Sequence, residues 1–211
     1  MAFITFEGPD GAGKTTQIRL LESYLRKHGV DLVSTRQPRG TDVGKQIAHV
    51  ILEMHHLRID AKTELFLYAA DRSQHVEEVI KPALSRGAWV LCDRYTDSSL
   101  ALQGAGGVSL ELIRQVNQLA TGGLEPDLTI LLDLPPDETL SRIEHRGDRP
   151  DRIESKGYEF HKRVREIYLR LAQLHSRFVV IDAQQSIEEI EHAVRLVADQ
   201  LLATANGQKE F

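Results

Sequence analysis

One short stretch near the start of the chain has the residue types and spacing needed to hold phosphate groups. It matches the pattern G-x-x-x-x-G-K-[ST] and, with the residue that follows it, reads Gly8-Pro9-Asp10-Gly11-Ala12-Gly13-Lys14-Thr15-Thr16. An apolar run, Phe3 to Phe6, precedes it, and a helical pattern follows it. Because the stretch stands between a predicted strand and a predicted helix, it indicates a phosphate-binding loop rather than an ordinary glycine-rich turn.

Each part of this loop has a mechanical role in binding phosphates. The glycines let the backbone turn tightly around an anion, while the N–H groups and the helix N-terminus supply positive potential. We expect Lys14 to reach the β- and γ-phosphates and the Thr15 hydroxyl to bind Mg²⁺. The predicted ligand is therefore a nucleoside triphosphate with magnesium.

Apolar runs alternate with helical patterns along the rest of the chain. Strands are predicted at 3–6, 31–35, 88–92, 128–134 and 178–181, and helices at 14–28, 61–84, 109–121, 136–145, 157–175 and 186–203. This alternation is typical of the α/β class, with a five-stranded parallel sheet flanked by helices. Since the chain has 211 residues, of which 41% are hydrophobic, we expect one domain over 1–211.

Composition excludes several classes of partner. Lys and Arg number 26 against 31 Asp and Glu, a net charge of -5, so no overall basic field points to nucleic acid or an anionic membrane. The single cysteine, Cys92, stands in an apolar run, which argues against disulfides and fits a reducing compartment. No apolar run approaches the length of a bilayer span. We therefore expect a cytoplasmic protein without membrane or nucleic-acid partners.

Arginines gather at the predicted ligand-binding edge of the sheet. Arg36 and Arg94 follow two predicted strands, and Arg72 lies on the long predicted helix. Ligands of open parallel sheets bind beyond the carboxyl ends of the strands, so these arginines suggest a second, anionic substrate beside the triphosphate. A regulatory GTPase would need a base-specifying element such as N-K-x-D, which the sequence lacks. A kinase of a small phosphorylated acceptor fits better.

Further motifs resemble those of bacterial thymidylate kinases in order and spacing. They are Phe6-Glu7-Gly8 with the rest of the loop to Gln17, Thr35-Arg36-Gln37-Pro38, Tyr68-Ala69-Ala70-Asp71-Arg72, Asp93-Arg94-Tyr95-Thr96-Asp97-Ser98-Ser99 and Asp151-Arg152-Ile153-Glu154. The likeness covers almost the whole chain. It implies the three-layer P-loop NTPase fold and phosphoryl transfer from ATP, with Mg²⁺, to thymidine monophosphate (dTMP) for dTTP synthesis. It also implies a homodimer.

The resemblance also implies roles for individual residues. Arg36 and Arg94 would bind the acceptor phosphate and Arg72 the thymine edge, with Tyr68 stacking on the base. The acceptor would also meet Ser98, Ser99 and Gln103. Asp10 would contact the acceptor sugar or the metal region, and Asp93 would bind magnesium in its outer shell. Two alternatives stay open: another nucleoside monophosphate kinase with relaxed acceptor choice, and a nucleotide-binding regulatory protein without turnover.

A charged segment at about 146–154 is predicted to form a short lid over the site. Some members of the family have an arginine inside the phosphate loop, but this chain has Gly11 there. The resemblance therefore assigns the catalytic cations to the lid, as Arg146, Arg149 and Arg152, without choosing among them. Three positions depart from the family pattern: Gln37 replaces a glutamate, Arg39 a glycine and Leu102 an aromatic residue.

Overall fold

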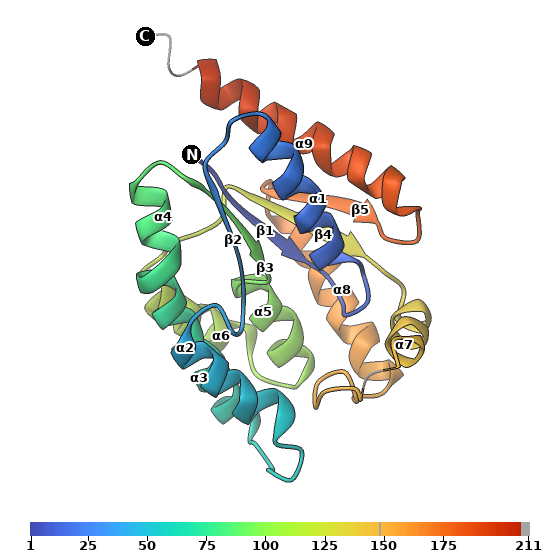
Figure 1. Ribbon diagram of the computed structural model, residues 1–211. Helices are drawn as coiled ribbons and strands as arrows, with labels where there is room; N and C mark the ends of the chain where they lie inside the picture. The colour runs from blue at the N-terminus through green and yellow to red at the C-terminus, as the bar shows by residue number, and fades with distance from the viewer. Residues whose placement is uncertain (148, 208–211) are drawn as a thin grey trace.

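The computed structural model describes residues 1–147 and 149–207 and is built around a parallel sheet (Figure 1). The strand order is β2-β3-β1-β4-β5, and all four pairings are parallel. The strands are β1 (Phe3–Glu7), β2 (Leu32–Arg36), β3 (Trp89–Asp93), β4 (Leu128–Asp133) and β5 (Phe178–Asp182). The predicted α/β class and five-stranded parallel sheet are confirmed.

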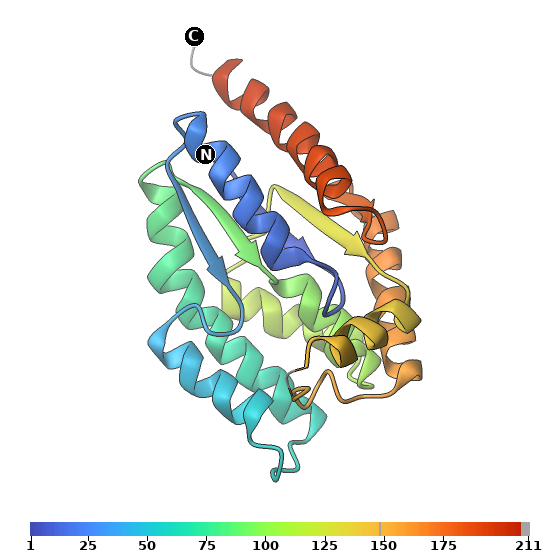
Figure 2. The ribbon, with the colours of Figure 1, turned by 45° about the vertical axis from the view of Figure 1, so that its right-hand side comes forward.

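Helices cover both faces of the sheet, as Figure 2 shows. Helices α1 (Lys14–Lys27) and α9 (Ile187–Gly207) lie over one face, where Ile4 and Phe6 of β1 belong to their apolar cluster. The other face carries α5 (Thr96–Ala105) and α8 (Tyr158–Leu174), with α6 (Leu110–Thr121) packed against α5. Phe3 belongs to a cluster on that second face, because successive side chains of a strand point to opposite sides. The result is a three-layer arrangement.

The long helix predicted at 61–84 is present as three consecutive helical segments. These are α3 (Ala61–His75), a π-helical turn η2 (Val76–Ile80) and α4 (Lys81–Ser85). Asp60 begins the run, since its side chain accepts a hydrogen bond from the backbone N–H of Lys62 at 2.9 Å. Helix α3 runs from Glu64, which bonds to Arg152 of the predicted lid, to His75, which bonds to Thr35 of the edge strand β2.

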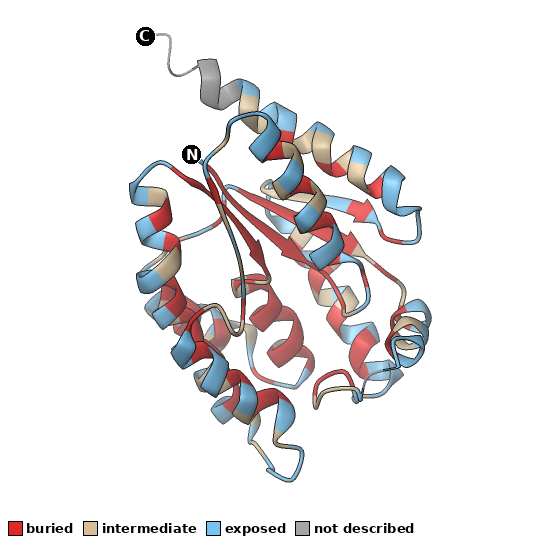
Figure 3. Cartoon of the chain, in the orientation of Figure 1, coloured by how far each residue is buried: buried red, intermediate tan, exposed pale blue. Residues whose placement is uncertain are grey.

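Two helices lie where the sequence patterns predict none. One is α2 (Asp42–Ala48), which passes into the π-helical turn η1 (His49–Glu53), and the other is α5. Figure 3 shows that α5 is buried along its length, between the sheet and other helices. Both unpredicted helices follow strand ends, so they shape the walls of the ligand-binding edge.

The predicted lid connects α7 (Pro136–His145) to α8. Residue 148 of this segment lies outside the described part of the chain. Beyond it, the Asp151 carboxylate accepts hydrogen bonds from the backbone N–H groups of Ile153 (2.7 Å) and Glu154 (2.8 Å), which folds the end of the segment into a turn. Among the described helices, none has the length and apolar content to cross a bilayer.

Candidate active site

A cavity of about 840 Å³ opens at the carboxyl ends of β1, β2 and β3. Most of the predicted site residues line it: Asp10, Gly11, Gly13, Lys14, Thr15, Thr16, Arg36, Tyr68, Arg72, Asp93, Arg94, Ser98, Ser99, Gln103, Arg146 and Arg149. The predicted residues Gly8, Pro9, Ala12 and Arg152 are not in this lining. The cavity is polar and rich in arginine, which suits anionic ligands.

The phosphate loop has the backbone conformation that its glycines predict. Gly8 has φ +133°, and a Cβ there would lie 2.3 Å from the backbone carbonyl oxygen of Leu132. Gly13 has φ +89° at the start of α1, a left-handed conformation that suits glycine. The side chain of Lys14 folds over the loop, where its Nζ donates to the carbonyl oxygens of Gly8 (3.1 Å) and Pro9 (2.7 Å).

The charge of Lys14 leads to a prediction about pH. Burial lowers the pKa of Lys14 to about 8, an effect that Arg94 reinforces and nearby carboxylates oppose. Bound phosphates favour the protonated amine of Lys14. Above pH 8 the amine of the free protein is mostly neutral, so it has to take up a proton when ATP binds. We expect ATP affinity to be flat below pH 8 and to fall up to about tenfold per pH unit above it. Calorimetric titrations from pH 7 to 10 measure this, and a constant affinity across that range contradicts it.

Two of the predicted metal-binding groups are in direct contact. Thr15 Oγ1 donates a hydrogen bond to Asp93 Oδ2 at 2.8 Å, where α1 begins beside the end of β3. Among the described residues there is no group of three or more His, Cys, Asp or Glu side chains that could enclose a metal. A hydroxyl with one carboxylate fits Mg²⁺, which keeps several waters and shares substrate phosphates rather than filling a protein cage.

Arg94 lies at the centre of the cavity wall and is held by several acceptors. Its Nη2 donates to Asp10 Oδ1 at 2.5 Å, and its Nη1 donates to the Gly8 carbonyl oxygen at 2.8 Å. Burial alone would raise the pKa of Asp10, but Arg94 and Lys14 outweigh it and lower that pKa to about 2. Arg94 has φ +71°, a rare conformation for a residue other than glycine. Its guanidinium is therefore firmly placed beside the phosphate loop.

Arg72 is almost completely buried, and its hydrogen-bond acceptors among the described residues are all uncharged. Its Nε donates to Gln37 Oε1 (3.0 Å), its Nη1 to Asn117 Oδ1 (2.6 Å), and its Nη2 to the Tyr95 carbonyl oxygen (3.1 Å) and Ser99 Oγ (3.0 Å). A guanidinium has five N–H donors, so one on Nη1 is left for a ligand. The departure at Gln37 thus leaves Arg72 without a directly bonded carboxylate.

The other two departures also lie at the cavity. The guanidinium of Arg39 pairs with Glu53 Oε1 at 2.7 Å, which offsets the added positive charge. The neighbouring Arg36 is exposed and forms no ion pair with any described residue, so it is free to meet an anion. Leu102 packs in one apolar cluster with Tyr68 and with Ile153 of the lid. The lid therefore packs in the same apolar cluster as the cavity residues Leu102 and Tyr68.

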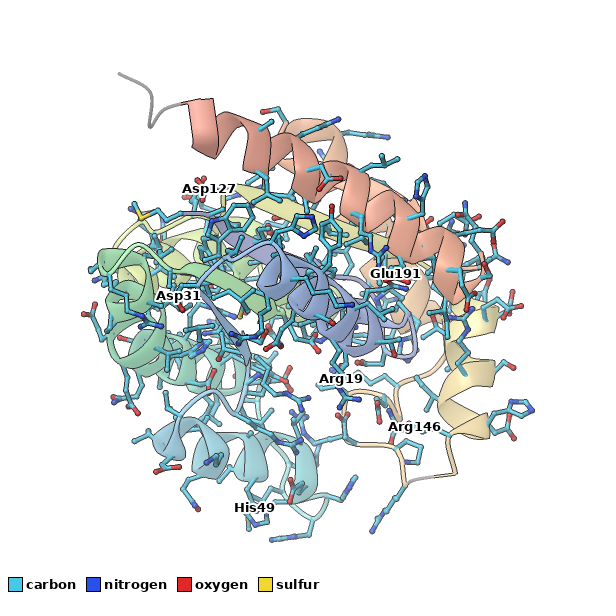
Figure 4. All side chains as sticks on the ribbon, turned by 45° about the horizontal axis from the view of Figure 1, so that its top comes forward. Arg19, Asp31, His49, Asp127, Arg146 and Glu191 are labelled. Carbon is cyan, nitrogen blue, oxygen red and sulfur yellow. The ribbon has the colours of Figure 1, made fainter. Side chains whose placement is uncertain are left out.

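The three lid arginines have different surroundings. Arg146, labelled in Figure 4 where α7 passes into the lid, forms two hydrogen bonds of 2.8 Å with Glu154. Arg149 is exposed and forms no ion pair with any residue that the structure describes. Arg152 instead bonds to the buried Glu64 and donates from Nε to the Ile51 carbonyl oxygen at 2.8 Å. Arg152 therefore fastens the lid, and the other two line the cavity.

The structure adds residues that the sequence patterns do not single out. Glu64, one turn before Tyr68, accepts hydrogen bonds from both Arg152 and Gln103 Nε2, the latter at 3.0 Å. Arg142 of α7 donates to the carbonyl oxygens of Gly11 (3.1 Å) and Ala183 (2.9 Å), so it bridges the phosphate loop and the end of β5. The four-residue spacing of Glu64 and Tyr68 on one helix face is the one sequence signal that points to Glu64.

Comparisons with known proteins agree with this geometry. The family model described as thymidylate kinase matches residues 6–194. The thymidylate kinase of Exiguobacterium sp. is 51% identical to this chain over 91% of both chains. The thymidylate kinase of Deinococcus radiodurans is also 51% identical, over 90% of this chain and 92% of its own. The thymidylate kinase of Caldanaerobacter subterraneus is 46% identical over 96% of this chain and 97% of its own. The chain belongs to the thymidylate kinase family.

Proposed function

We propose that this protein transfers the γ-phosphoryl group of ATP to dTMP, which yields dTDP and ADP. One observation carries the proposal within the family: the cavity that holds Lys14 and Thr15 of the phosphate loop also holds the three arginines Arg36, Arg72 and Arg94. A triphosphate and a phosphorylated acceptor can therefore bind face to face, which is the main requirement of phosphoryl transfer.

The acceptor half of the site is assigned by charge and shape. Arg36 and Arg94 hold the acceptor phosphate, since planar guanidinium groups match phosphate oxygens better than a point charge does. The spare N–H of Arg72 meets the thymine edge, and Tyr68 forms the wall against the base. Ser98, Ser99 and Gln103 of α5 line the remaining side.

The donor half of the site is the phosphate loop. Its backbone from Gly8 to Thr16 surrounds the phosphates, and Lys14 exchanges its two carbonyl partners for phosphate oxygens. Thr15 and, in the outer shell, Asp93 would hold Mg²⁺, which when bound would neutralise charge on the phosphates. Arg146 and Arg149 of the lid supply further positive charge to the transferring group, while Asp10 keeps Arg94 in place.

A coupled assay of ATP turnover with Mg²⁺ tests this function. The acceptors are the monophosphates of thymidine, deoxyuridine, uridine, cytidine, adenosine and guanosine. We expect strong preference for dTMP. Turnover of a different acceptor would reassign the substrate, and nucleotide binding without turnover of any acceptor would show a regulatory protein instead.

Leu102 leads to a prediction about sugar selectivity. Leucine fills less of the wall beside the acceptor sugar than an aromatic ring does, so we expect weak discrimination against a ribose 2′-hydroxyl. The ratio of kcat/KM for deoxyuridine and uridine monophosphates should be smaller in the natural protein than in Leu102→Tyr. Equal ratios in the two proteins would refute this role of Leu102.

We also propose that the protein is a homodimer. Phe66 on α3 and Leu119 on α6 are 55% and 84% exposed, and these two helices pack against each other. Large exposed apolar side chains on adjoining helices favour a self-complementary interface. Sedimentation should show a dimer that Leu119→Asp dissociates, and a monomeric natural protein would overturn the proposal.

One domain over 1–211 and a cytoplasmic location stay predictions.

A further inference from the structure

Glu7, the last residue of β1, is a buried carboxylate with no assigned role in the proposed reaction. Its side chain has no exposed surface, and it directly precedes the phosphate loop. Oε1 accepts a hydrogen bond from the backbone N–H of Tyr95 at 2.7 Å. Oε2 accepts from Ser98 Oγ at 2.6 Å and from Tyr168 Oη at 2.9 Å. Burying a carboxylate is costly unless it is hydrogen-bonded, and these three donors compensate the cost. Glu7 is therefore part of an ordered buried hydrogen-bond network.

The same two hydroxyl groups connect Glu7 to Arg94. Arg94 Nη1 lies 3.2 Å from Ser98 Oγ and 3.4 Å from Tyr168 Oη. A hydroxyl group has one hydrogen and two lone pairs. When both hydrogens point to Glu7 Oε2, the lone pairs are free to accept from Arg94. The Glu7 carboxylate, which accepts hydrogen bonds at both oxygens, therefore sets the direction of both hydroxyl groups.

Without Glu7 Oε2 as their shared acceptor, the hydrogens of the two hydroxyl groups could point in other directions. Their oxygens are 2.9 Å apart, so one hydrogen could bridge them and the other could turn toward Arg94. An O–H aimed at an N–H donor is repulsive, so Arg94 Nη1 would lose hydroxyl acceptors. The guanidinium would then be held mainly by the Gly8 carbonyl at Nη1 and by Asp10 at Nη2.

Arg94 needs such support because it has to face a phosphate in one orientation. Its side chain is 12% exposed, and its Nε–H has no acceptor among the residues that the structure describes. That donor is available to the acceptor phosphate. A guanidinium fixed on its other edges loses little freedom when it binds, which favours tight phosphate binding.

We propose that Glu7 is a positioning residue that orients the Ser98 and Tyr168 hydroxyl groups toward itself, so that they hold Arg94 against the acceptor phosphate. This inference rests on the proposed function, because it needs a phosphorylated acceptor at Arg94. Glu7 touches neither substrate in this arrangement and acts only through its neighbours.

The isosteric variant Glu7→Gln tests the proposal. The backbone N–H of Tyr95 can only donate, so the amide oxygen stays there and the amide NH₂ replaces Oε2. This group donates to both hydroxyl groups, so one of their hydrogens can bridge the two oxygens and the other turns toward Arg94. We expect dTMP affinity to fall about tenfold to a hundredfold, the range for a lost hydrogen bond to a charged group. Thymidine, which has no phosphate, should bind as it does to the natural protein.

Calorimetry with dTMP, thymidine and ATP separates positioning from damage to the fold. Unchanged ATP and thymidine binding with weakened dTMP binding supports the proposal. Equal losses for dTMP and thymidine, or unchanged dTMP binding, overturn it. If Glu7→Gln does not fold, Tyr168→Phe removes one of the two hydroxyl links between Glu7 and Arg94 and should lower dTMP affinity while thymidine binding stays unchanged. Where both variants fold, adding Glu7→Gln to Tyr168→Phe should lower dTMP affinity by a smaller factor than Glu7→Gln does alone.

Measurements on the natural protein distinguish a failure of the inference about Glu7 from a failure of the proposed function. If the natural protein binds dTMP no better than thymidine and transfers no phosphoryl group, the proposed function falls and this inference falls with it. If the natural protein is active and Glu7→Gln keeps its dTMP affinity, only the role of Glu7 is overturned.

Discussion

Replacing Lys14 with alanine is expected to lower kcat for dTMP phosphorylation about a thousandfold, the upper range for removing one preorganised charge from a transition state. Lys14 is buried over the phosphate loop, and its present partners are two carbonyl oxygens that the phosphates can replace. The lost charge acts on oxygens whose negative charge grows during transfer, so kcat should fall further than the affinity for ATP. Coupled turnover and calorimetric ATP binding measure the two effects.

Lys27→Ala is the matched control for this experiment. Lys27 lies in the last turn of the same helix, α1, but it is exposed and outside the cavity lining. Its removal should leave kcat and ATP affinity unchanged, with at most a small loss of helix stability. If Lys14→Ala kept about a tenth of the natural kcat, the proposed role of Lys14 in transfer would be wrong.

Removing both cavity-lining arginines of the lid should have an effect of similar or larger size. We expect the Arg146→Ala, Arg149→Ala double variant to lose about 10³ to 10⁵ in kcat, the range known for arginines that meet a transferring phosphoryl group. Both substrates should still bind, because the phosphate loop, Arg36 at the end of β2 and Arg94 directly after β3 are intact. Single-turnover kinetics with saturating substrates isolates the transfer step.

Two further variants complete the lid experiment. Arg170→Ala removes an exposed arginine of α8 outside the cavity lining and should leave kcat unchanged. Arg152→Ala should act on stability instead, since it leaves the buried Glu64 without its ion-pair partner, at a cost of about 3 kcal/mol. A double variant with natural kcat, or an Arg152→Ala variant with natural stability and greatly reduced kcat, would contradict the assignment of the three arginines.

The elements with a strong periodic pattern could be predicted, and α5 shows why others could not. The three central strands β1, β3 and β4 are largely apolar and almost wholly buried, because helices cover both faces of the sheet there. Helix α5 has ten residues and none of them is exposed, so polar and apolar positions do not alternate with a helical period. Helix α2 has only seven residues, too few for such a pattern. Burial on all sides and short length hide a helix from sequence reasoning.

The residues of the candidate site also fall into a group that could be predicted from the sequence and a group that could not. The positions of Lys14, Arg36 and Arg94 follow from a loop motif and from strand ends, which parallel topology brings to one edge. The contact of Arg152 with Glu64 spans 88 residues of sequence, and that of Tyr168 with Glu7 spans 161. Such pairs depend on how whole helices pack, and no local pattern encodes their partners. The cavity walls were thus predictable, but the network behind them was not.

Helix α3 also limits which insertions and deletions this protein can accept during evolution. Along one buried face it carries Glu64, which holds the lid, then Tyr68 and Arg72 of the cavity, and then His75, which bonds to Thr35 of β2. A single inserted residue within this stretch would rotate everything beyond it by about 100° and separate lid, cavity and sheet at once. The connection at 54–60 before the helix carries no such constraint. We therefore expect insertions and deletions to be tolerated in the connecting loops and not within α3.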